Sequence, residues 1–212
     1  MMMSPGLRKL ALTTHVTSSV GWLGSVAAFL ALAIAGISSE DSQIVRAAYL
    51  AMHLTTWFVI VPFSFASFLT GLVESLGTPW GLFRHYWVVT KLLLTVLATI
   101  VLLVHTQPID RIAEVAAQSV LSSRYLQQLR LQLIGDASAA LFVLLATTTL
   151  SVYKPWGMTP YGIRQQYAAT GHWHAAARHR ARPSGRYVLI AIGAFLAVIL
   201  LIHLFGGGIH TH

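Results

Sequence analysis

The sequence contains no cysteine and few charged residues. Without Cys, its 212 residues cannot form disulfides, iron–sulfur clusters or a catalytic thiolate, so His, Asp, Glu and Lys remain as ligands for a metal or cofactor. Only 9% of the residues are charged, against about 25% in an ordinary soluble domain. By contrast, 56% are hydrophobic and the mean hydropathy is +0.68. So few charges cannot cover the surface of a water-soluble enzyme, and we therefore expect an integral membrane protein.

Several motifs of soluble catalysts are also missing. The chain has no Walker A motif, Rossmann fingerprint, HExxH motif or nucleophile elbow, so ATP-driven transport and soluble-type dehydrogenation have no support. Asparagine is absent and Arg outnumbers Lys, which we attribute to codon bias in a GC-rich bacterial genome. The net charge of +8 favours contact with anionic lipid over nucleic acid. We expect a multi-pass protein of the bacterial cytoplasmic membrane.

Five segments satisfy the requirement of about 20 mostly apolar residues for a membrane-spanning helix. They are residues 11–37, 44–73, 86–105, 134–153 and 187–205. The first run is longer than the roughly 7–15 apolar residues of a signal peptide, so we expect it to be retained. The sequence thus predicts an all-α membrane bundle, with four antiparallel helices and a fifth at their side, in a single membrane domain over residues 1–212.

The distribution of basic residues predicts the orientation. Most Lys and Arg residues fall on the side of the N-terminus, many of them in the basic inner loop 154–186, so the positive-inside rule places the N-terminus inside and the C-terminus outside. The outer loop 106–133 is long and carries Ile112 and Leu129 at helical spacing. This spacing fits an amphipathic helix on the membrane surface or extensions of the neighbouring spans. Pro62 is expected to kink the second span.

Ionisable residues at membrane depth are functional hypotheses by default, and here they fall into two layers. The inner layer contains His15, His85 and Lys91, with Glu74 at the boundary; the outer layer contains His53, His105 and His203, with Asp136 near the same level. Neutral imidazole is a good axial ligand for haem iron, and facing helices of a bundle can offer it. We therefore predict one or two haem b groups. The outer one would be held by His53 with His105 or His203, and the inner one by His15 with His85 or Lys91.

The same residues also have alternative, purely structural interpretations. His85 and His105 lie at helix ends, where His commonly meets headgroups, and Lys91 can extend toward the inner headgroups. Asp136 can pair with Arg130 or Arg111. Two further patterns, one in the basic loop and one at the C-terminus, would bind copper or zinc weakly or simply be solvated; they comprise His172, His174, His179, His210 and His212.

Short motifs in the first three spans resemble a known bacterial family. His15 is followed by Gly21-Trp22-Leu23-Gly24, and Thr78-Pro79-Trp80-Gly81-Leu82 precedes Tyr86 and Lys91-Leu92-Leu93-Leu94. Over residues 11–105 this pattern resembles the CopD-like membrane proteins, a group that more distantly includes the HemJ protoporphyrinogen oxidases. The resemblance to HemJ implies a haem role for His15 and Lys91, with His53 a looser match. The resemblance to CopD implies copper passage instead, although without Cys and with few Met residues the chain offers few soft ligands for Cu(I).

Three functions follow as hypotheses. The first is a haem-b redox protein that passes electrons between a quinol-like membrane donor and an acceptor. The second is a component of a copper or other metal permease. The third is a non-catalytic subunit of a membrane complex. The expected partners are membrane lipid, a quinone, and other membrane subunits or further copies of the chain, but not nucleic acid.

Overall fold

The computed structural model describes residues 3–78, 81–117, 124–154 and 157–170. All regular elements within these ranges are helices. Four of them are long and apolar enough to cross a membrane, namely Pro5–Ser38, Ser42–Gly77, Tyr86–Ala117 and Gln127–Tyr153. They correspond to the first four predicted spans. The predicted fifth span, His203, and the histidines of the basic loop and the C-terminus lie outside the described residues.

The first two spans each begin directly after an N-cap residue. Helix α1 (Pro5–Ser38) starts with Ser4 as its N-cap and Pro5 at its first position, an arrangement that uses the fixed φ of proline. Helix α2 (Ser42–Thr55) starts at Asp41, whose carboxylate accepts from the amide of Gln43 at 2.8 Å. These caps explain why both helices begin a few residues before the apolar runs that predicted them.

The second span contains a π-helical turn. Helix α2 continues into η1 (Thr56–Ile60) and then α3 (Val61–Gly77) without a break. The amide of Val61 bonds the carbonyl of Thr56, one residue further back than in an α-helix. Pro62, which has no amide hydrogen, follows immediately. A π-turn is one way in which a helix accommodates the lost hydrogen bond, so the irregularity expected at Pro62 takes this form.

Residues 106–133 differ from the expected outer loop. Helix α4 (Tyr86–Val104) leads directly into α5 (Thr106–Ala117), and α6 (Arg124–Tyr153) begins ten residues before the predicted fourth span. Helix α5 packs mainly against α2, and its apolar face is buried through Ile109, Ile112, Ala113 and Ala116. The apolar spacing therefore belongs to a helix packed on the bundle and to an extended α6. Of the two alternatives for this segment, the structure therefore has the extensions of the neighbouring spans, which hydropathy missed because it marks only the most apolar part of each helix.

The predicted inner loop also contains a helix. Helix α7 (Pro160–Thr170) is held beside the start of α4, because the Thr159 hydroxyl donates to the carbonyl of Phe83 at 2.6 Å and the Thr159 amide donates to the carbonyl of Arg84 at 2.9 Å. A Cβ on Gly162 would lie 2.4 Å from that same Arg84 oxygen. Only glycine therefore allows this close approach.

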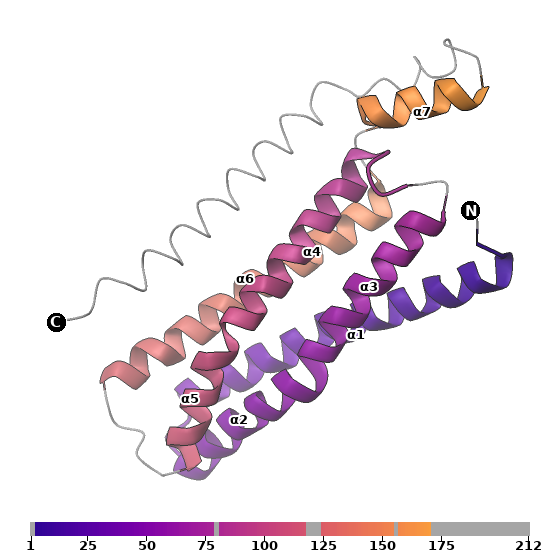
Figure 1. Ribbon diagram of the computed structural model, residues 1–212. Coiled ribbons are helices and arrows are strands. Elements are labelled where there is room, and N and C mark those ends of the chain that lie inside the picture. Colours follow the sequence, from indigo (N-terminus) through magenta and orange to yellow (C-terminus); the bar gives the residue numbers. More distant parts are fainter. Residues whose placement is uncertain (1–2, 79–80, 118–123, 155–156, 171–212) are drawn as a thin grey trace.

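The long helices form a four-sided bundle (Figure 1). Helix α1 packs against α2–α3 on one side and α6 on the other, while α4 closes the bundle between α3 and α6. The core clusters around Trp22, Phe29, Met52, Ile112 and Leu133. Many large apolar side chains point outward instead, including Phe58 and Phe142 at 75% and 72% exposure. An apolar exterior suits contact with lipid.

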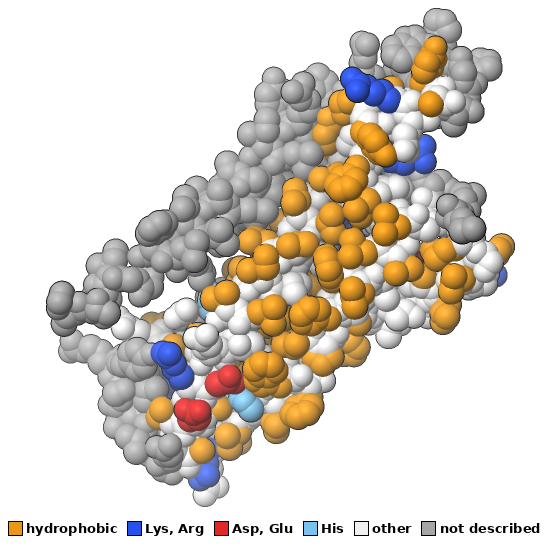
Figure 2. Space-filling model, viewed as in Figure 1, with side chains coloured by type: hydrophobic (Ala, Val, Ile, Leu, Met, Phe, Trp, Pro, Cys, Tyr) orange, Lys and Arg blue, Asp and Glu red, His pale blue; other side chains and the backbone are white. Residues whose placement is uncertain are grey.

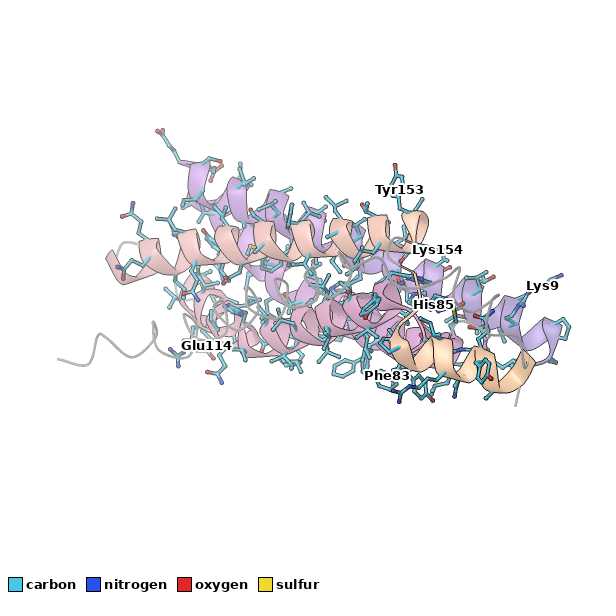
Figure 3. The ribbon with its side chains drawn as sticks, turned by 90° about the horizontal axis from the view of Figure 1, so that it is seen from above. Lys9, Phe83, His85, Glu114, Tyr153 and Lys154 are labelled. Carbon is cyan, nitrogen blue, oxygen red and sulfur yellow. The ribbon has the colours of Figure 1, made fainter. Side chains whose placement is uncertain are left out.

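The charged groups mark the two ends of the bundle. Hydrophobic side chains cover the middle of the face shown in Figure 2, and acidic and His side chains gather at the end formed by α5. Figure 3 places Lys9, His85 and Lys154 toward one end and Glu114 at the other. We call these the N-terminal end, where α1 and α4 begin, and the α5 end. The apolar belt between them supports a multi-pass membrane protein.

Candidate functional site

His15 sits inside the bundle at its N-terminal end. Its side chain leaves α1 and is 7% exposed. The Nδ1 atom lies 3.0 Å from the carbonyl oxygen of Ser67 and 3.1 Å from the hydroxyl of Thr70, both on α3. The Thr70 hydroxyl donates its own hydrogen to the carbonyl of Ala66 at 2.6 Å. Both neighbours of Nδ1 therefore act as acceptors.

This arrangement determines the tautomer of His15. Because a carbonyl oxygen can only accept, Nδ1 must carry the hydrogen, and in a neutral ring Nε2 then presents a lone pair. Nε2 faces Lys91 Nζ of α4 at 3.1 Å. The Lys91 ammonium donates to it. A backbone carbonyl that fixes the ring and frees Nε2 is the usual arrangement around an imidazole that binds a metal.

Three helices surround the His15–Lys91 pair with further polar or small groups. Glu74 of α3 lies within electrostatic range of Lys91. The hydroxyls of Ser19 and Ser67 bond each other at 2.7 Å across the α1–α3 contact. A Cβ on Gly71 would lie 3.1 Å from Cε1 of the His15 ring, so glycine at this position provides the space that the imidazole fills. We call these residues on α1, α3 and α4 the His15–Lys91 site.

At the α5 end, His53 belongs to a different, half-exposed group. Its Nε2 lies 3.2 Å from Asp110 Oδ1 of α5, and each side chain is 38% exposed. The same carboxylate oxygen accepts from the indole N–H of Trp57, in the π-turn, at 2.9 Å. This group joins α2 and η1 to α5. It opens onto the exterior rather than into the bundle core.

His105 is buried, and each of its ring nitrogens lies near an oxygen atom of another residue. It is the C-cap of α4 and is 5% exposed. Its Nδ1 lies 2.7 Å from the carbonyl oxygen of Val101, and its Nε2 lies 3.0 Å from Asp136 Oδ2 of α6. Asp136 thus pairs with a histidine. The Arg130 guanidinium lies over the Tyr49 ring, 5.3 Å from its centroid.

The structure brings together some of the predicted pairs of haem ligands but not others. The structure brings His15 and Lys91 together, one of the two inner pairs considered. His85 lies at the N-cap of α4, where its backbone pairs with Met158 and its ring centroid lies 6.4 Å from that of Trp87. His53 and His105 do not face each other, because each meets the carboxylate of another helix. Within the described ranges, no three His, Asp or Glu side chains are grouped so that they could hold a metal ion.

Several neighbours of these histidines were missed from the sequence. Ser67, Thr70 and Gly71 gave no signal, because small and hydroxylated residues are common in membrane helices for packing reasons. Asp110 gave no signal of a contact with His53 either. Its position in α5, which folds back onto α2, is what brings it to His53 and Trp57.

Comparisons with known proteins assign neither a family nor a function to the chain. No protein-family model, no curated protein and no solved structure matches the chain. The function must therefore be argued from the geometry of the two ends.

Proposed function

We propose that the chain is a haem-b-binding redox protein of the bacterial cytoplasmic membrane, with His15 as the axial ligand. The observation that supports this most directly is a buried imidazole whose Nδ1 is held by the Ser67 carbonyl, so that Nε2 keeps its lone pair and presents it toward Lys91. Neutral imidazole is an established axial ligand for haem iron, and a ligating His usually donates its other N–H to a backbone carbonyl, carboxylate or water. When bound, the haem would supply one-electron transfer, here between a quinol-like donor in the membrane and an acceptor.

The residues around His15 fit this role. Ser67 and Thr70 hold the ring from the α3 side, and Gly71 leaves space for it. Lys91 donates to the same Nε2 atom at 3.1 Å, so it would keep the lone pair of that atom in place and would have to withdraw from it when the haem is bound. The same two residues carry the resemblance to HemJ-like proteins, and this agreement favours haem over copper.

The α5 end does not suit a second haem held by His53 and His105. Both ring nitrogens of His105 already face acceptors, and His53 is bonded to Asp110. We therefore place the proposal at His15 alone. In the proposed topology, this end of the bundle lies on the cytoplasmic side with the N-terminus.

Absorbance spectra of the purified, haem-supplemented protein test the proposal. We expect a Soret band that shifts on reduction, is lost in His15→Ala and is retained in His53→Ala, the matched control at the other end. Lys91→Met is expected to shift the band or weaken it. If the folded wild type takes up no haem, or if His15→Ala retains the full band, the proposal is wrong. Copper retained by haem-free protein would then favour a permease component. A stable partner subunit without either group would favour a structural role.

A further inference from the structure

The environment of His105 requires one more proton than a neutral histidine and an ionised aspartate contain. The carbonyl oxygen of Val101, at 2.7 Å, can only accept a hydrogen bond from Nδ1. Asp136, at 3.0 Å, can also only accept from Nε2 when it is ionised. A neutral imidazole has a single N–H and can satisfy only one of these two acceptors. The second hydrogen bond therefore needs an additional proton.

That proton has two possible positions within the pair. It can reside on Nε2, which gives an imidazolium opposite a carboxylate, or on Asp136, which then donates to the lone pair of Nε2. In either form the pair stores one dissociable proton. Leaving the pair without it would place two acceptor atoms opposite each other in a site where His105 is only 5% exposed, which is costly.

The half-exposed pair at the same end does not have this property. His53 is bonded at Nε2 to Asp110, so a single N–H satisfies that contact and no additional proton is required. The two pairs also differ in burial. The side chains of His53 and Asp110 are equally exposed, whereas in the second pair His105 is enclosed and Asp136 retains 22% exposure.

We propose that His105 and Asp136 form a proton-binding site that exchanges its proton with the outside through Asp136. The proton lies between His105 and Asp136 inside the bundle, and the partly exposed Asp136 side chain provides the route. The other charged and titratable side chains described at this end are Glu40, Asp41, Arg46, Tyr49, His53, Asp110, Arg111, Glu114 and Arg130. The site lies at the end opposite His15 and does not depend on haem binding.

Two spectroscopic methods test the site in the full-length protein in detergent micelles. ¹⁵N NMR of ¹⁵N-histidine-labelled protein reports the protonation of the His105 ring, and infrared spectroscopy reports the protonation of the Asp136 carboxyl group. At neutral pH we expect one of two signatures. Either a His105 signal has both nitrogens protonated, or a protonated carboxyl band belongs to Asp136. Loss of the nitrogen signal in His105→Gln assigns that signal to His105, and loss of the carboxyl band in Asp136→Asn assigns that band to Asp136. The control Asp110→Asn, at the exposed pair, is expected to leave both signatures unchanged.

Raising the pH tests exchange. We expect the signature to be lost reversibly, by one proton, while the protein stays folded. In Asp136→Asn we expect His105 to be neutral already at neutral pH. A neutral His105 with an ionised Asp136 at neutral pH in the wild type would overturn the proposal. So would a signature that persists unchanged across the whole pH range of the folded protein, because that behaviour belongs to a fixed ion pair. If His105→Gln does not fold, Asp136→Asn alone distinguishes these outcomes.

Discussion

The two ends of the bundle use histidine in opposite ways. At the N-terminal end, His15 has acceptors on one side only, and its other nitrogen meets the amine of Lys91. At the α5 end, His105 has acceptors on both sides. The same side chain thus offers a lone pair at one end and, in our proposal, shares an additional proton with Asp136 at the other. A histidine at membrane depth could serve either purpose. The groups next to its two ring nitrogens distinguish a site that could bind a metal from one that could bind a proton.

Filling the space beside His15 is expected to have the largest effect. A leucine at Gly71 would push the imidazole ring away from the Ser67 carbonyl, because even a Cβ there would lie 3.1 Å from the ring. We expect haem affinity to fall by about 10- to 100-fold, as for other changes that disturb a ligand's orientation. Haem titration of the apoprotein measures this.

Gly24→Leu on α1 is the matched control for that variant, because a Cβ at Gly24 meets no atom within 4 Å. Equal losses of haem affinity in the two variants would mean that added bulk, and not displacement of His15, is responsible.

Removing Asp136 is expected to have the next largest effect. Asp136→Ala leaves the Nε2 atom of buried His105 without its carboxylate, and an unsatisfied buried polar group costs about 1–3 kcal/mol. Reversible unfolding in mixed detergent micelles measures the loss in the free energy of unfolding. Ser138→Ala serves as the control on the same helix, because the exposed Ser138 hydroxyl only bonds the Ile134 carbonyl. A loss no greater than that of the control would contradict the assigned contact.

Ser67→Ala separates the backbone of α3 from its side chains. It removes the hydroxyl that bonds Ser19 but keeps the carbonyl that fixes His15. We expect the free energy of unfolding to fall by about 0.5–1.5 kcal/mol, with the haem spectrum and affinity unchanged. A marked change in the Soret band would show that the hydroxyl, and not the carbonyl, determines the orientation of the ring.

The half-exposed pair of His53 and Asp110 is expected to contribute least to the free energy of unfolding. Asp110→Ala removes the acceptor of His53 and Trp57, but half-exposed ion pairs typically contribute about 0.2–1 kcal/mol. The same unfolding measurement compares it directly with Asp136→Ala. A larger loss for Asp110→Ala would reverse the order of the two pairs and contradict the distinction drawn from their burial.

The sequence predicted the parts of this structure that depend on composition and length. Hydropathy located the four described spans, and the positions of His15 and Lys91 along their helices made their pairing one of the alternatives. Contacts that depend on helix rotation could not be predicted this way. The pairing of His105 with Asp136 requires a particular face of α6, and the contact between Asp110 and His53 requires α5 to fold back onto α2. Neither rotation nor chain reversal is visible in hydropathy.

The amount of haem bound per chain tests the central claim most directly. Haem quantified after denaturation, relative to protein determined by amino-acid analysis, is expected to give one haem per chain in the wild type and in His53→Ala, and close to none in His15→Ala. Absence of haem from the wild type would contradict the account. Two haems per chain, one of them lost in His53→Ala, would contradict the assignment of the α5 end to proton binding.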